Sequence, residues 1–344
     1  TAEGSVSLQA IGAVAALRER FGDRADWRIN LARPDGAITG TLETDSLIAN
    51  VSGNRNPDES ALRLAPFKAD VTELDAPRLL GQDGLEFSAF SADGQLSVWS
   101  GSSFAFDGEI RAPKIRYNDY QVEGVVSQGR IGLVDRVLAL ETKLAGSSVI
   151  GLPSQITFEN RPNAQVEVDA QIDLADMSAL IDRLSVQIGE SSLSAMGEIS
   201  RRGAVDMSGD LSVPDLQGMV ALEGDWTIEG MNVSAFTSRF SGIADLSGAP
   251  EDWRDLAGTS ADLNLVIQRT PDDISVDRAS VRSDRLTMMA QGQLSSGRIA
   301  LNGQANLAGI SRSGVNADTI NTEFSLLGPF VAPVLNVVAT APRL

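Results

Sequence analysis

The stretch VALEGDWTI, residues 220–228, decides the fold class. Alternate side chains of an extended strand point to the same face. One face of this stretch carries Val220, Leu222, Gly224, Trp226 and Ile228. Four of these residues are apolar, whereas Gly224 weakens a strand and offers nothing to pack. A strand with one apolar face is predicted, and the glycine at the centre of that face needs its own explanation.

The same pattern recurs along the chain as alternate apolar residues with a small residue near the middle. The further examples are FAFDGEIRA (104–112), VEVDAQIDL (166–174), LSAMGEI (193–199), VDMSGDLSV (205–213), LTMMAQGQL (286–294) and IALNGQANL (299–307). One apolar and one polar face is typical of an antiparallel sheet that is solvated on one side. We therefore predict an all-β chain with a largely antiparallel, repetitive sheet and a few short helices.

Small residues at mid-strand let a sheet bend across its strands, so that it folds into an elongated apolar groove. The predicted fold line consists of Gly108, Ala170, Gly197, Gly209, Gly224, Gly292 and Gly303. The predicted groove lining consists of Phe104, Phe106, Ile110, Val166, Val168, Ile172, Val205, Met207, Leu211, Val220, Leu222, Trp226, Ile228, Leu286, Met288, Ile299 and Leu301. The alternative is that the small residues let two packed sheets approach each other, and the geometry of single strands leaves both open.

An internal repeat supports a repetitive architecture. DRLSV (182–186) returns as DRASV (277–281), and Gly197 corresponds to Gly292 at the same offset of 95 residues. Short turn signals separate the strands, as in hairpins or a meander. They are Asp93-Gly94, Asn118-Asp119, Arg202-Gly203 and Ser296-Gly297. The alternation changes parity near Asn118-Asp119, which predicts a turn or bulge there.

Helices are predicted at three places. Residues 8–21 have apolar residues near helical spacing and stop before Gly22, so a helix within residues 1–22 is expected to cover one end of the groove. A membrane-surface helix is the alternative for this segment. LADMSALIDRL (174–184) and PEDWRDLAG (250–258) are shorter candidates. No signal peptide and no window long enough to span a bilayer are visible.

Composition narrows the function classes. The 344 residues include 46 acidic and 28 basic ones, a formal charge of −18, so a nucleic-acid partner is not expected. Histidine and cysteine are both absent, which removes disulfides, thiolate and imidazole zinc ligands, and Ser–His or Cys–His nucleophile pairs. The acidic pairs Glu251-Asp252 and Asp272-Asp273 lie in polar, turn-like contexts, where solvated loop charge is the simpler reading. We expect no enzyme activity and no cofactor.

Several segments resemble the TamB family of AsmA-like proteins from the Gram-negative envelope. The resemblance rests on the strand pairs at 191–216 and 283–310, on QIDLADMSALIDRL (171–184) and on LLGPFVAPVLNVVATAP (326–342). It covers most of the chain, best from about residue 95 onward, with matched repeat regions at 95–218 and 219–310. It implies that residues 1–344 are one elongated segment of a β-sheet rolled into a taco-like groove.

The resemblance also implies a function. Members of the family are anchored to the inner membrane, lie in the periplasm, and are thought to carry phospholipids towards the outer membrane. They also take part in outer-membrane protein assembly with an Omp85-type partner, TamA. Neither the anchor nor the partner-binding region is visible here. The implied ligands are phospholipid acyl chains, and contact with TamA would be made through regions outside this chain.

Two other classes compete with this reading. A surface adhesin built as a β-solenoid would close its apolar faces into a dry core and act through its outer surface. No regular short-period coil is visible, which counts against it. A polysaccharide enzyme would need paired acids in an aromatic-lined cleft, and aromatic residues make up only 5% of the chain.

Overall fold

The computed structural model describes residues 1–7, 22–32, 36–55, 62–75, 77, 84–87, 89–99, 103–151, 162–216, 219–232, 234–271, 273–295, 297–312, 315–329 and 332–341. Within these ranges the chain is all-β. These ranges contain 23 strands, which pair in antiparallel fashion, and one helix, α3 (Glu251–Ala257), which lies in one of the connections. The predicted fold class is confirmed. The chain divides into two compact units, and the division passes through β13 (Ser178–Ile188).

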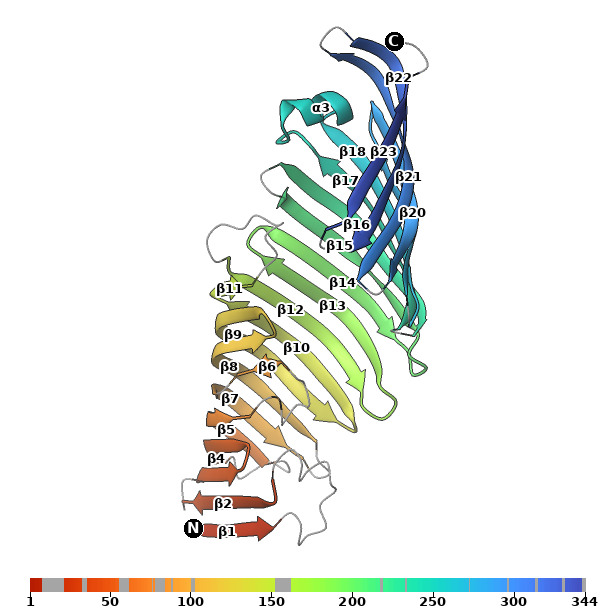
Figure 1. Ribbon diagram of the computed structural model, residues 1–344. Coiled ribbons are helices and arrows are strands. Elements are labelled where there is room, and N and C mark those ends of the chain that lie inside the picture. Colours follow the sequence, from red (N-terminus) through yellow and green to blue (C-terminus); the bar gives the residue numbers. More distant parts are fainter. Residues whose placement is uncertain are drawn as a thin grey trace. The chain divides into compact units, whose positions relative to one another are not determined.

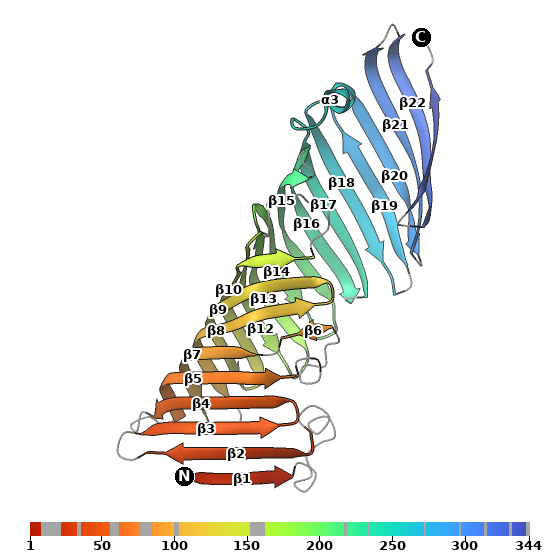
Figure 2. The ribbon, with the colours of Figure 1, turned by 60° about the vertical axis from the view of Figure 1, so that its left-hand side comes forward.

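The first unit is an antiparallel sheet built almost entirely from neighbours in sequence. Its strands are β1 (Ala2–Ser7), β2 (Arg24–Leu31), β3 (Ala37–Thr44), β4 (Leu47–Arg55), β5 (Leu62–Leu74), β6 (Leu85–Glu86), β7 (Phe90–Val98), β8 (Phe104–Tyr117), β9 (Tyr120–Val134), β10 (Val137–Gly146), β11 (Ser148–Ile150) and β12 (Ala164–Asp173). Figure 2 shows β1 to β5 following one another as antiparallel neighbours. The two short strands are side additions: β6 pairs with β8, and β11 pairs with β9. Accordingly β5 pairs with β7, and β10 pairs with β12.

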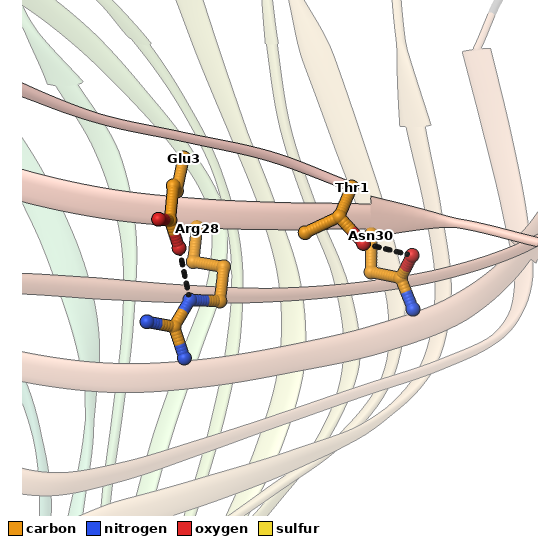
Figure 3. Close-up of polar contacts among 4 residues, drawn as sticks. All are labelled: Thr1, Glu3, Arg28 and Asn30. Atoms are coloured by element: carbon orange, nitrogen blue, oxygen red, sulfur yellow. Dashed lines mark hydrogen bonds and ion pairs between the residues drawn. The ribbon is translucent and has the colours of Figure 1, made fainter.

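The pairing of β1 with β2 shows how the polar face is organised. The antiparallel register places Glu3 opposite Arg28. Figure 3 shows the Arg28 Nε donating to the Glu3 carboxylate at 3.0 Å, and the Thr1 hydroxyl donating to the Asn30 side-chain oxygen at 3.0 Å. Side chains on one face of paired strands lie close enough to interact. These exposed polar contacts therefore mark the solvated face at this end of the sheet.

The second unit continues the same kind of meander. Its strands are β14 (Ser191–Ile199), β15 (Val205–Leu216), β16 (Val220–Asn232), β17 (Ala235–Asp245), β18 (Ser260–Arg269), β19 (Ile274–Arg282), β20 (Leu286–Ser295), β21 (Arg298–Arg312), β22 (Val315–Pro329) and β23 (Val334–Thr340). Each pairs with the next in sequence. Figure 1 shows that strands β20 to β22 bend along their length. The predicted helix at 250–258 is confirmed as α3, which lies between β17 and β18.

The hairpin turns follow the sequence signals in two cases. Asn118 adopts a φ of 52° in a two-residue turn that puts Tyr117 opposite Tyr120, which explains the predicted change of parity. Gly203 turns the chain between β14 and β15 with a φ of 81°. Positive φ values of this kind suit glycine and asparagine. Both turn predictions are confirmed.

The predicted helix at 174–184 is wrong. Residues 174–177 form a turn, and β13 begins at Ser178. The Asp173 side chain accepts a hydrogen bond from the Ala175 N–H at 2.8 Å, and Asp176 accepts one from the Ser178 N–H at 3.1 Å. Such bonds stabilise turns rather than helix interiors. The apolar residues that follow then alternate along a strand.

Two further predictions concern the first unit. Asp93-Gly94 does not form a turn, because both residues lie within β7, where Gly94 faces Gly108 of β8. The helix predicted at residues 8–21 lies outside the described ranges, and residues 2–7 before it form β1.

Candidate functional site

The pairing registers of the first unit collect the predicted lining residues on one face. Phe104 is opposite Leu133, which is opposite Leu138, which in turn faces Ile172. Parallel rows join Phe106 to Ala170 and Ile110 to Val166 by the same route across β9 and β10. Each step of these rows crosses from one strand to the next. The apolar face is therefore continuous from β8 to β12.

The second unit has the same arrangement. Met207 faces Ile228, and Val213 faces Leu222, so β15 and β16 turn their apolar residues to one side. Across β17 to β19 the rows continue through residues such as Leu263, and they reach Met288 in β20. Leu286, Ile299 and Leu301 belong to the same face through the pairing of β20 with β21. The predicted lining residues of this unit therefore share one surface.

This apolar face is covered only in part. Of all the predicted lining side chains, Phe106 and Val205 are buried and the others are half-buried. No large side chain among the described residues is less than 2% exposed. Two sheets packed face to face would bury such residues fully, at crystal-like density. The described strands therefore form a single layer whose apolar face has no second layer over it.

Glycine pairs mark where the sheet folds towards its apolar side. A Cβ built on Gly224 lies 2.6 Å from the Cα of Gly242 on the next strand, and the reverse distance is 2.9 Å. In an ordinary pair of strands the Cβ atoms of opposite residues stand about 4.5–5.5 Å apart. The two backbones therefore lean towards each other on the face where the apolar side chains lie. Only glycine fits such an approach.

The first unit contains the same feature across three strands. Gly108 is opposite Gly94 on one side and Gly129 on the other. A Cβ on Gly108 lies 2.7 Å from the Cα of Gly94, and Gly129 has a φ of 150°, which side chains rarely adopt. These three residues form a straight line across β7, β8 and β9. This line of close approach passes through Gly108, one of the predicted fold-line residues.

Aromatic rings fill the space above these glycines. The Phe240 Cζ lies 2.7 Å from the Cβ positions of both Gly224 and Gly242, and the Phe106 Cζ lies 2.9 Å from that of Gly108. Phe106 also packs against Phe67 in an edge-on arrangement with ring centroids 6.1 Å apart. An aromatic ring that covers a strand glycine is a known device for stabilising curved sheets. The few aromatic residues of the chain are thus placed where glycine leaves a gap.

The other predicted fold-line residues are each opposite a larger side chain and not a second glycine. Gly197 faces Met207, Gly209 faces Trp226, Gly292 faces Leu301 and Gly303 faces Phe324. At each of these glycines an added Cβ would meet backbone or ring atoms of a neighbouring strand, which at Gly209 is β14, through the Ser194 carbonyl. Ala170 is opposite Leu140, two residues away from the position that continues the Gly108 line, and it carries a Cβ.

Sequence reasoning missed Gly94, Gly129 and Gly242. A signal for one of them was present, since Phe240 precedes Gly242 by two residues on the same face, as Phe106 precedes Gly108. The pairing of Gly94 with Gly108 depends on the register, which has no local signal.

The opposite face is polar and carries ion pairs between neighbouring strands. Lys68 lies 3.1 Å from Asp93, Lys143 lies 2.7 Å from Glu167, and the Arg239 guanidinium lies 3.1 Å from Glu229. These pairs are largely exposed, so each contributes about 1 kcal/mol at most. Their role is to hold neighbouring strands and keep this face solvated.

Three hollows in the second unit also lie on the polar face. One of about 680 Å³ and one of about 530 Å³ lie over β20 to β23, where Met289, Gln304, Glu323 and Val338 form one row across the strands. A third, of about 700 Å³, lies over β16 to β18, and four of its ten lining residues are acidic. None of these three hollows lies on the apolar face.

The described residues offer no cluster of three or more acidic side chains that could hold a metal ion. Nor does any helix in the described ranges have the length and hydropathy to cross a membrane. No family model, no curated protein and no solved structure matches the chain.

Proposed function

We propose that this chain is a non-enzymatic β-sheet protein of the TamB type, and that its apolar face receives the acyl chains of phospholipids and conducts them between membranes. The observation that carries the proposal is that, in each unit, the described strands have no second layer of described strands over their apolar rows. Large aliphatic side chains stand half-exposed across many neighbouring strands, although burying them would stabilise a compact protein. An exposed apolar surface of this extent favours an apolar partner.

Phospholipid acyl chains fit this surface by their physical chemistry. Each methylene group that leaves water contributes about 0.8 kcal/mol when fully buried. An open face lets the acyl chain lie on the sheet while the headgroup stays in water beyond the strand ends. Movement along the sheet needs neighbouring positions of similar affinity, and rows of Leu, Ile, Val and Met provide such positions.

The proposal includes a periplasmic location in a Gram-negative cell and a role in outer-membrane biogenesis. Contact with an Omp85-type partner would be made by regions outside these 344 residues. The resemblance of the strand pairs at 191–216 and 283–310 to the TamB family supports this part.

The test is native mass spectrometry of the chain purified without harsh detergent. We expect several phospholipid molecules on each chain, and a loss of most of them in Leu222→Glu, because a carboxylate on the apolar face repels acyl chains. Thr227→Glu is the matched control, since it adds the same charge to β16 on the polar face, opposite Arg239. It should keep the bound lipid. A folded chain without lipid would refute the conduit and would favour a structural scaffold.

A further inference from the structure

One basic residue stands on the apolar face of the second unit. The registers from β15 to β23 assign residues to the apolar or the polar rows. Among the described side chains Arg269 is the only basic residue in the apolar rows, and Asp318, two residues before Ile320 on β22, is an acidic one. Arg269 is opposite Phe236 on one side and Ile274 on the other. A charge there is costly unless it remains hydrated or finds a partner.

The surroundings of Arg269 hold the side chain but leave its donors free. The guanidinium carbon lies 5.9 Å from the centroid of the Phe236 ring, within the range of a cation–π contact. Within the described residues no carboxylate forms an ion pair with it, although the chain carries 46 acidic residues. Arg269 is exposed and is the last residue of β18, so its N–H groups face water where the strands end.

The same end of the second unit carries further positive charge. Arg202 lies in the turn between β14 and β15, and Arg298 opens β21 after the turn that follows β20. Asp273 is an acidic residue in the adjacent turn, where its backbone carbonyl accepts a hydrogen bond from the Thr270 N–H at 2.8 Å. At physiological ionic strength, charges interact over about 8 Å. Charges beyond this range, which include most of the net charge of −18, are therefore largely screened at Arg269.

We propose that Arg269, held against the ring of Phe236, binds the phosphate of an anionic phospholipid whose acyl chains lie on the adjacent apolar rows. This inference rests on the proposed function and adds a headgroup preference to it. A planar guanidinium offers paired N–H groups that match phosphate oxygens. The ring presents one side of that plane to the ligand, and the rows that end at Ile274 and Phe236 supply the apolar surface.

The experiment measures which lipids the chain selects. The purified chain is incubated with vesicles that contain equal amounts of phosphatidylglycerol and phosphatidylcholine, then re-isolated, and its bound lipids are counted by native mass spectrometry. We expect phosphatidylglycerol to be enriched about threefold, the scale of one exposed ion pair. Arg269→Gln should return the ratio to that of the vesicles.

Arg278→Gln is the matched control. Arg278 is an exposed arginine in the bulge of β19, outside the apolar rows, so its loss should leave the enrichment as in the unaltered chain. Enrichment that survives in Arg269→Gln, or that is lost equally in both variants, would overturn the assignment of the site. A chain that binds no lipid of either kind would instead refute the proposed function.

A second arm separates a headgroup site from a site for free phosphate. Inorganic phosphate is titrated into the unaltered chain and followed by ³¹P NMR. We expect no saturable binding, because the acyl chains supply most of the affinity. Saturable binding that disappears in Arg269→Gln, in a chain that shows no lipid selectivity, would assign the site to free phosphate.

Discussion

A single methyl group tests whether the glycines set the fold. In Gly108→Ala the new Cβ would lie 2.7 Å from the Cα of Gly94 and nearer still to the Asp93 carbonyl oxygen, whereas an ordinary contact begins at 3.4 Å. The facing atoms belong to the backbone and cannot rotate away. Strands β7 and β8 must therefore separate at the fold line, and overpacking of this kind costs about 1–3 kcal/mol.

Gly132→Ala is a control on the next strand, β9. Its Cβ would meet the Phe104 carbonyl oxygen at 3.6 Å and the Ala105 Cβ at 3.7 Å, both ordinary contacts. Alanine is more stable than glycine in a strand by about 0.5–1 kcal/mol. The same substitution should therefore stabilise the first unit at Gly132 and destabilise it at Gly108, by about 2 kcal/mol in the second case.

Urea unfolding followed by far-UV circular dichroism measures both variants against the unaltered chain. We expect the midpoint of Gly132→Ala to rise or stay and that of Gly108→Ala to fall, with unchanged slopes. Equal stability of the two variants would refute the reasoning, because the close approach of the strands would then carry no energy.

Three further predictions follow from other parts of the molecule. Met288→Glu and Leu301→Glu should each lower the amount of bound lipid in native mass spectrometry, as Leu222→Glu does, and unchanged loading in all three would argue against a continuous apolar face. The Ser178 hydroxyl and N–H donate to Asp176 and lower the pKa of its carboxyl; this stabilises the fold while Asp176 is ionised and is lost as the pH falls through the lowered folded pKa. Ser178→Ala should therefore raise that pKa in an NMR titration, and an unchanged value would contradict the assignment. Glu3→Gln removes the exposed pair with Arg28 and should change the free energy of unfolding by less than about 1 kcal/mol, a limit that urea titration can check.

The alternation of side chains carried most of the fold information in this sequence. It predicted the all-β class and the shared face of residues such as Val220 and Ile228, because a period of two is a property of the strand itself. Gly197 and Gly292, which the internal repeat aligns, also occupy similar places in the structure. Each is opposite an apolar residue of the next strand in sequence, Met207 for Gly197 and Leu301 for Gly292.

The errors have a common cause. Asp93-Gly94 is a strong hairpin signal when read alone, but the register makes Gly94 the partner of Gly108. Residues 174–184 have several good helix formers, yet the Asp173 and Asp176 carboxylates accept hydrogen bonds from the N–H groups two residues ahead and set a turn, after which the chain enters the sheet as β13. In both cases pairing with a neighbouring strand overrides the local preference, at Gly94 and from Ser178 onward.

The fold line and the open apolar face have one physical origin. A strand that bends towards its apolar side must give up side-chain volume where it bends, so glycine occupies the centre of the face. The rings of Phe106 and Phe240 then pack over these glycines and fill the space that a side chain would occupy. The larger aliphatic side chains are left on either side of the bend, where no other described strand packs over them. Folding the sheet in this way therefore leaves rows of half-exposed apolar side chains along it, and an apolar ligand is the partner that such rows suit.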